Sequence, residues 1–245
     1  MFRMLLFCLL LVVAAMPARA QSSFTPAQTQ ELEKLVREIL IKNPQILVEA
    51  MQALDEQQDQ RRAEAAAAAI KERKKEITED LASFAFGNLK GDVVLVEFFD
   101  YRCPYCKQVQ PSVQALVKED KNLKIVLKEL PVLGPESVLA SRAAIAALRL
   151  QKEKYLAFHD AMMEFRGDLD EAAVMRLAAQ AGLDTAKLKQ GMAAPEVEAI
   201  IQRNLDLAHA LGIEGTPGFV IGDKLIPGAL PLDALRQVIA EQRRK

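Results

Sequence analysis

An apolar run followed by two closely spaced cysteines constrains the fold of this chain more than any other feature. Residues 93–99 read VVLVEFF, a β-branched and aromatic run that is short enough for a buried strand. Residues 100–106 form a turn with both cysteines, residues 107–119 have helical character, and residues 123–130 indicate another strand. This order predicts a parallel βαβ unit in which the cysteine pair opens the helix.

The rest of the second half predicts a helical insertion and a closing hairpin. Residues 134–212 are rich in Ala, Leu and charged residues, and they are broken by Gly and Pro. Strand signals return at residues 218–222 and 224–226, and a final helix is expected over 231–244. The expected fold class is therefore α/β, with the order β-α-β, a helical insertion, and β-β-α.

Helix signals fill residues 21–79. Thr25 and Pro26 are a good N-cap and first helical residue, and Asn43-Pro44 interrupts the pattern. Apolar residues at helical spacing lie on one face before and after this break: Leu32, Leu35, Val36, Ile39, Leu40, Ile46, Leu47, Ala50, Met51 and Leu54.

From Asp55 this apolar stripe fades into an Ala-rich and charged stretch. Two short helices cannot bury much surface alone. We predict that residues 25–54 drive homo-oligomerisation and that residues 55–80 form a helical stalk. The alternative is a helical hairpin that folds back on its own domain.

Residues 1–20 have the parts of a secretory signal peptide. Arg3 is basic, residues 5–15 are apolar, and small residues at Ala18 and Ala20 predict cleavage after Ala20. The apolar run is too short to span a bilayer. We expect a periplasmic protein, while export from a one-membrane cell stays open.

Cleavage changes the cysteine count. Of the 3 cysteines, Cys8 leaves with the signal peptide, so the mature chain keeps Cys103 and Cys106. An oxidising compartment permits a disulfide between them. The formal net charge of −1 gives no general attraction to nucleic acid, so no nucleic-acid partner is expected.

A Cys-x-x-Cys pair has three interpretations. A zinc site needs two more ligands, but His159 and His209 lie in predicted helices without metal-ligand spacing. A structural disulfide across so small a loop removes little chain entropy. The position after a strand and at a helix start favours a redox pair. We expect no metal and no cofactor beyond the redox-active disulfide Cys103–Cys106.

The helix start assigns different roles to the two cysteines. Free N–H groups and the helix dipole stabilise a thiolate at Cys103, the expected nucleophile, and Cys106 is the resolving thiol. Pro104 suits the first helical turn, and Pro104 and Tyr105 are expected to tune the pair. Glu97 is predicted to be a buried acid that relays the proton of Cys106. The alternative is an edge strand on which Glu97 faces water.

Residues 87–88, 91–93, 97–101 and 103–107 resemble the active-site region of DsbA-like periplasmic thiol–disulfide oxidoreductases. The resemblance implies a thioredoxin fold over residues 81–245, with a helical domain inserted at about 134–205. It also implies that Pro217 follows a cis peptide bond and that Thr216 and Pro217 bind substrate. Cysteine-containing secreted proteins and a membrane redox partner are the implied partners.

The segment Asn43-Pro44-Gln45-Ile46-Leu47 resembles a subgroup that includes the copper-sensitivity suppressor ScsC, in which extra N-terminal helices can drive oligomerisation. Strongly oxidising DsbA enzymes have His where this chain has Tyr105. Thr216, in place of Val, is typical of isomerase-type relatives. We therefore expect an isomerase or reductase. A DsbA-type dithiol oxidase and a copper-binding or chaperone module are the alternatives.

Overall fold

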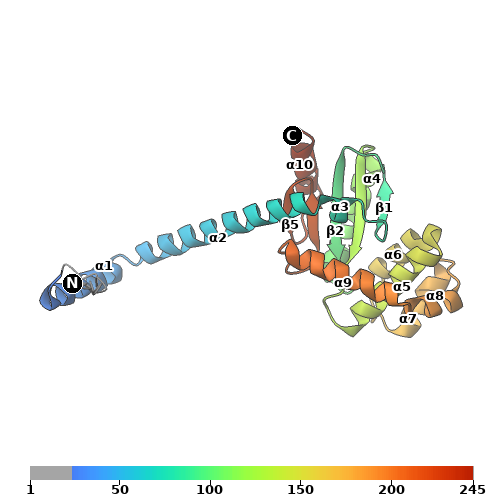
Figure 1. The fold of residues 1–245 in the computed structure, drawn as a ribbon, viewed down its shortest axis with the longest axis horizontal. Helices are drawn as coiled ribbons and strands as arrows, with labels where there is room; N and C mark the ends of the chain where they lie inside the picture. The colour runs from blue at the N-terminus through green and yellow to red at the C-terminus, as the bar shows by residue number, and fades with distance from the viewer. Residues whose placement is uncertain (1–23, 245) are drawn as a thin grey trace, which may run out of the picture. The chain divides into compact units, whose positions relative to one another are not determined.

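A computed structural model describes residues 24–244, which divide between two units, residues 1–56 and residues 57–245 (Figure 1). The predicted signal peptide and its cleavage after Ala20 lie outside the described residues. Within residues 24–244, no helix has the length and apolar character needed to cross a bilayer.

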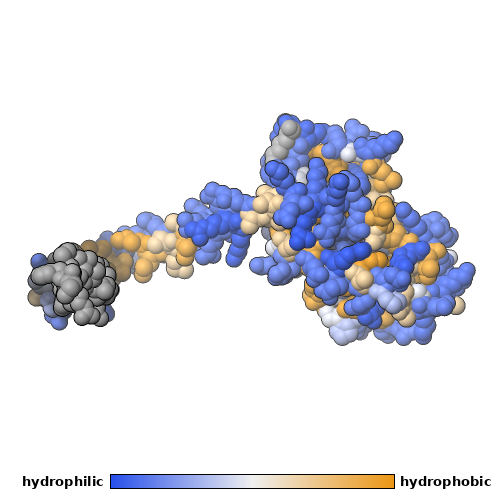
Figure 2. Space-filling model, viewed as in Figure 1, coloured by the Kyte–Doolittle hydropathy of each residue, from blue (hydrophilic) through white to orange (hydrophobic). Residues whose placement is uncertain are grey.

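The first unit contains helix α1 (Pro26–Lys42) and the beginning of α2 (Gln45–Glu72). Thr25 forms a capping box with Gln28, Pro26 occupies the first turn, and α1 ends at Asn43, as the sequence predicts. Figure 2 shows hydrophobic residues along the beginning of α2 and hydrophilic residues along its middle. Leu40 is half-buried, and these large apolar side chains of the unit are exposed: Leu32, Leu35, Val36, Ile39, Ile41, Ile46, Leu47, Val48, Met51 and Leu54.

The second unit is built on a mixed sheet with the strand order β1-β3-β2-β4-β5. Its strands are β1 (Phe84–Gly87), β2 (Val93–Phe99), β3 (Leu123–Glu129), β4 (Gly218–Ile221) and β5 (Lys224–Pro227). Strands β2 and β3 are parallel and are joined by α4 (Pro104–Glu119), so the predicted βαβ unit is confirmed. Strands β4 and β5 form the predicted antiparallel hairpin.

Helices cover both faces of this sheet. Leu95 and Phe99 of β2 belong to the larger core, together with side chains of α4 and of the final helix α10 (Leu232–Arg243). Phe98, on the opposite face of β2, belongs to a second core that includes Leu207 of α9 (Pro195–Ala210). The cysteine pair therefore opens a helix that is packed on the central strand.

The stalk predicted over residues 55–80 was expected to be solvated, but the second half of this segment contains buried side chains. Ile70 near the end of α2 and Ile77 in the short helix α3 (Lys74–Thr78) are buried in the second core. Residues 57–72 accordingly belong to the same unit as the sheet, so the boundary lies near residue 56 and not near residue 80. Burial of these two isoleucines and of Ala66 packs this segment onto the rest of the unit.

The insertion between β3 and β4 is entirely helical. It starts with α5, as predicted near residue 134, and it extends to Ala210, about one turn beyond the predicted end near residue 205. Besides α9, its helices are α5 (Pro135–Leu150), the 3₁₀ turn η1 (Lys152–Lys154), α6 (Tyr155–Glu164), α7 (Glu171–Gln180) and α8 (Thr185–Met192).

Candidate active site

Cys103 occupies the N-cap of α4, directly after the central strand. Its backbone is extended, with φ of −70° and ψ of 118°, and Pro104 is the first residue of the helix. The backbone N–H groups of Tyr105 and Cys106 are therefore directed toward the Cys103 sulfur, where they favour the thiolate. Tyr105 itself is 61% exposed.

The pKa of the Cys103 thiol is lowered to about 5. A hydrogen bond with the Cys106 side chain is the largest cause; partial burial opposes it, and hydrogen bonds from Thr216 and from backbone N–H groups add to it. The Cys103 thiol also lies close enough to donate to the Thr216 carbonyl oxygen, at 3.1 Å. Cys103 is therefore mainly a thiolate at neutral pH, although Tyr105 supplies no cationic group.

Cys106 has the opposite character. It is fully buried, whereas Cys103 keeps 4% of its surface exposed, and both cysteines are free thiols. Burial raises the pKa of Cys106 far above that of an ordinary thiol, and the hydrogen bond with Cys103 and the charge of Glu97 raise it further. This asymmetry agrees with the predicted roles, in which Cys103 attacks and Cys106 resolves.

The loop before β4 lies against the cysteine pair. The Thr216–Pro217 peptide bond is cis, as the family resemblance implies. Pro217 is buried and Thr216 is half-buried. The contact with Cys103 places Thr216 beside the reactive sulfur.

Glu97 lies in the middle of β2, between Leu127 of β3 and Phe219 of β4. It is fully buried, which excludes the alternative of an edge strand facing water. Neither of its carboxyl oxygens has a hydrogen-bond partner among residues 24–244. Burial, and secondly the negative charge of Cys103, raise the pKa of Glu97 to about 8. The carboxyl group is therefore mostly neutral at pH 7.

Asp100 holds the turn between β2 and the cysteines. Its Oδ1 accepts hydrogen bonds from the Arg102 N–H (2.8 Å) and the Ser137 hydroxyl (2.8 Å). Its Oδ2 accepts from the N–H groups of Val132 (2.9 Å) and Leu133 (3.1 Å). Asp100 therefore ties the cysteine turn to the loop that opens the helical insertion.

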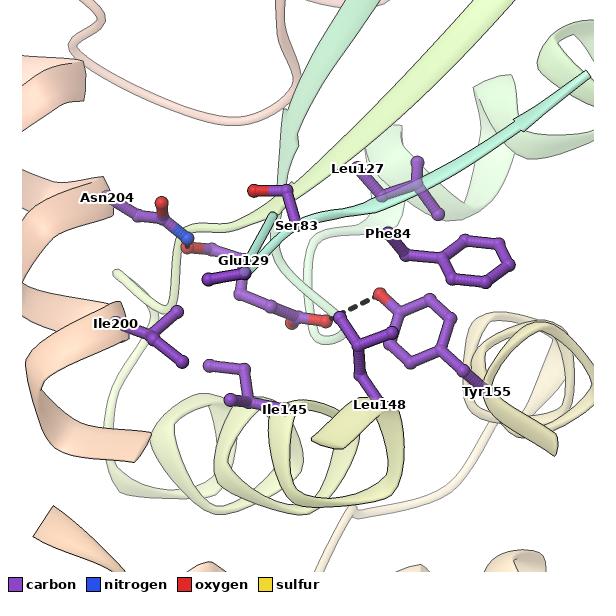
Figure 3. Close-up of a pocket in the computed structure, with 10 residues that line it drawn as sticks. Ser83, Phe84, Leu127, Glu129, Ile145, Leu148, Tyr155, Ile200 and Asn204 are labelled. Atoms are coloured by element: carbon purple, nitrogen blue, oxygen red, sulfur yellow. Dashed lines mark hydrogen bonds between the residues drawn. The ribbon is translucent and has the colours of Figure 1, made fainter. Parts of the chain in front are cut away.

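A second buried acid, Glu129, was missed by sequence reasoning. Its carboxylate accepts hydrogen bonds from Tyr101 (3.1 Å), Tyr155 (2.9 Å) and Ser141 (2.9 Å). Figure 3 shows Glu129 beside Tyr155, at a cavity of about 10 Å³ that has room for one water at most. Burial outweighs the three donors and raises the pKa of Glu129 to about 8. Glu129 is the last residue of β3, where a polar side chain is common, so the sequence alone carried no signal of its burial.

The two histidines differ in burial. His159 is buried in α6 with Nδ1 at 3.0 Å from the Tyr101 hydroxyl, and burial lowers its pKa to about 3. His209 is exposed on α9. Across the described part of the chain, no three His, Cys, Asp or Glu side chains are grouped so that they could hold a metal ion.

Comparison with known proteins identifies two matching families. Residues 94–240 match the DSBA-like thioredoxin domain, and residues 28–61 match the N-terminal domain of the copper resistance protein ScsC. This chain belongs to the DsbA-like thioredoxin family. The fold is accordingly a thioredoxin-like fold with an inserted helical domain and an N-terminal helical segment, and the family supports a thiol:disulfide oxidoreductase.

Solved structures agree with this assignment. A thioredoxin-like oxidoreductase from Silicibacter pomeroyi is 43% identical, with a TM-score of 0.67 over 70% of this chain and 98% of that one. ScsC from Proteus mirabilis, in a transitional conformation, is 32% identical, with a TM-score of 0.68 over 91% of this chain and 98% of that one.

Curated relatives are matched over a smaller part of their length. The thiol:disulfide interchange protein DsbA of Bordetella parapertussis is 30% identical over 55% of this chain and 65% of its own. The chain spans between 24% and 65% of the first curated relatives that it matches. Membership of the family does not by itself assign the substrates and partners of those proteins to this chain.

The thiolate assignment predicts the pH dependence of alkylation. Iodoacetamide should react with Cys103 at a rate that falls as pH drops through about 5, because the thiolate is then protonated. A Cys106→Ala variant should move the midpoint upward more than Thr216→Ala does, because the Cys106 hydrogen bond is the larger cause. A wild-type midpoint near 9, the ordinary value, contradicts the assignment.

Because Glu97 is buried, we predict that replacing it with glutamine stabilises the folded protein. Its pKa rises from the ordinary 4.5 to about 8 in the folded protein, so its contribution to stability is lost progressively as pH rises from 4.5 to 8. Glu97→Gln should raise the free energy of unfolding by roughly 3 kcal/mol at pH 7, and less at pH 5. Urea titrations at several pH values measure this.

An exposed acid provides the matched control for that series. Glu49→Gln removes a carboxylate from the exposed surface of α2, so the pH dependence of its unfolding should follow the wild type. A Glu97→Gln variant that is less stable than the wild type at pH 7 contradicts the burial argument.

Proposed function

We propose that this chain is a periplasmic thiol–disulfide oxidoreductase that exchanges disulfides with cysteine-containing secreted proteins. The observation that carries the proposal is the asymmetry of the pair: Cys103 has a pKa of about 5 and contacts Thr216, while Cys106 is fully buried with a raised pKa. One sulfur is thus ready to attack, and the other is protected until the first has reacted.

The reaction proceeds in two exchanges. The Cys103 thiolate attacks one sulfur of a substrate disulfide; a mixed disulfide forms and the other substrate sulfur leaves as a thiolate. Cys106 then loses its proton and attacks the Cys103 sulfur, which releases the second substrate thiolate and leaves the disulfide Cys103–Cys106. Two electrons pass from the enzyme to the substrate, and the reverse sequence oxidises a substrate dithiol.

We assign Glu97 the role of accepting the proton of Cys106. While Cys103 is a thiolate, its charge helps to keep the Glu97 carboxyl protonated. Formation of the mixed disulfide removes that charge, so the pKa of Glu97 falls and its carboxylate fraction increases. A base therefore becomes available at the step at which Cys106 has to lose its proton.

We propose that the protein acts as an isomerase or reductase and that a membrane electron donor keeps the cysteine pair reduced. Thr216 before the cis-proline and Tyr105 between the cysteines support this direction over a DsbA-type oxidase recharged by a quinone-linked partner. The low pKa of Cys103 supplies a thiolate nucleophile, but a stabilised thiolate also makes the disulfide form more oxidising, so the preferred direction rests on Thr216 and Tyr105 alone.

The match to a copper resistance protein's N-terminal domain keeps a copper-binding or chaperone role as a second candidate. Residues 28–61 contain neither Cys nor His and a single Met, Met51, so the thiols of Cys103 and Cys106 are the proposed ligands of Cu(I). Stoichiometric copper binding by a protein that does not reduce insulin would favour this second role.

Variants of the two cysteines test the proposed function. Cys106→Ala should accumulate mixed disulfides with secreted proteins, because the resolving thiol is gone, and these are captured on a tagged chain and released by a reductant. Cys103→Ser, the control, should capture none and should lose at least about 100-fold in insulin reduction. A Cys103→Ser variant that keeps full activity contradicts the proposal.

Homo-oligomerisation through residues 25–54 is part of the proposal, since an assembly with several sites can hold a misfolded substrate. The apolar side chains exposed along α1 and the beginning of α2 support it. The mature chain should have a solution mass several times that of one subunit, measured by light scattering, and deletion of residues 21–54 should give monomers.

Point variants test whether the apolar side chains themselves, and not another effect of the deletion, hold the subunits together. Leu35→Asp with Ile39→Asp should also give monomers, because both side chains are exposed apolar residues of α1. Glu38→Gln, at an exposed polar position of the same helix, should leave the mass unchanged. A deletion variant with an unchanged number of subunits overturns this part of the proposal.

A further inference from the structure

A large groove lies beside the cis-proline loop, within the unit formed by residues 57–245. It has a volume of about 1120 Å³. Three segments line it: residues 59–67 of α2, residues 209–218 around the cis-proline, and residues 223–228 of the hairpin. Cys103 does not line the groove, but Thr216 does, and the Thr216 carbonyl oxygen lies 3.1 Å from the Cys103 sulfur, so the groove begins one residue away from the reactive sulfur.

The size and the lining of the groove fit a polypeptide better than a small molecule. Pockets for small ligands have volumes of roughly 300–1000 Å³ and are mostly enclosed. Charges of both signs occur along this groove, from Asp59, Arg62, Glu64 and Lys224. Such a lining selects no single charge, as suits an enzyme that acts on many secreted chains.

Backbone is accessible on one side of the groove. Gly212, Gly215 and Gly228 line it, and a Cβ added at any of them would meet no atom within 4 Å. Strand β5 is the edge of the sheet, and its Leu225 and Pro227 also line the groove. The N–H groups of Gly212 and Gly228 are already bonded to His209 and Pro217, so the glycines provide space for a peptide, and the edge strand β5 provides backbone that can pair with it.

The α2 side of the groove combines small residues with the polar side chains of Asp59, Gln60, Arg62 and Glu64. Ala63, Ala66 and Ala67 of α2 line the groove, and Ala66 is buried while Ala63 is exposed. Ile70, one turn further along α2, is buried in the second core and holds this end of the helix in place. Short side chains leave room for a chain between α2 and the hairpin.

We propose that residues 59–67 of α2 form the second wall of a substrate groove, which holds an extended polypeptide segment next to the cysteine that reacts with Cys103. The inference rests on the proposed function and adds to it the helix that contacts substrate. A chain linked to Cys103 through a disulfide passes Thr216 and from there enters the groove. This continuity favours substrate over a second copy of the protein as the occupant.

Enlarging one alanine of the wall tests the inference. Ala63→Leu and Ala63→Trp narrow the groove from an exposed helical position, which keeps the risk to folding small. The KM for insulin reduction should rise in the order Ala, Leu, Trp, by about tenfold for Trp. Exchange with oxidised glutathione, which is too small to fill the groove, should keep the wild-type rate.

The matched control is Ala68→Trp, an exposed alanine of α2 that does not line the groove; its KM for insulin should equal that of the wild type. Equal KM values for Ala63→Trp and Ala68→Trp overturn the inference. So does a variant whose solution mass falls while its KM is unchanged, because a second copy then occupies the groove. A wild-type protein that exchanges with neither disulfide instead refutes the proposed function itself.

Discussion

The contact between the Cys103 sulfur and the Thr216 carbonyl oxygen organises this molecule. It joins residues 113 positions apart at a distance of 3.1 Å. Pairing of β2 with β4 makes the contact possible, because Phe98 lies opposite Gly218 and the two loops leave the sheet at the same edge. The helix start and the hydrogen bond with Cys106 favour the thiolate, and the contact with Thr216 places the cis-proline loop beside the sulfur.

Buried acids connect this site with the helical insertion. Asp100 binds the cysteine turn to Ser137 at the start of α5, and Glu129 binds Tyr101 of the same turn to Tyr155 of α6. Lys107, directly after the second cysteine, donates to the carbonyl oxygen of Phe165 at 2.6 Å. The insertion therefore helps to fix the position of the reactive turn.

Much of this arrangement could be predicted from the sequence, because strong local signals specified it. The run of residues 93–99 has no competing helical period, and Cys-Pro-Tyr-Cys directly after a strand fixes where the helix starts. Burial of Glu97 followed from its position inside that run. Strand β1 was missed because it has only four residues, which are half-buried or exposed. β1 forms because it pairs with β3, and no local sequence pattern indicates it.

The packing of α2 and the Glu129 cluster were beyond local reasoning for a similar reason. Ile70 stands alone among alanines and charges, so its burial depends on a sheet formed far away in the chain. The hydrogen-bond donors to Glu129 come from residues 101, 141 and 155, and no regular sequence spacing relates these three positions. Contacts of this kind become visible only when the fold brings the segments together.

The stabilised thiolate at Cys103 is the central claim, and a comparison of the two redox forms tests it most directly. The measurement is the difference in the free energy of unfolding between the dithiol and the disulfide form, followed from pH 5 to pH 8. A pKa lowered from 9 to about 5 in the folded protein means that the dithiol form gains stability as pH rises. We predict a gain that stays below about 1.4 kcal/mol per pH unit relative to the disulfide form, because solvent screens this partly exposed sulfur. A difference that stays constant over this range, or that falls, would contradict it.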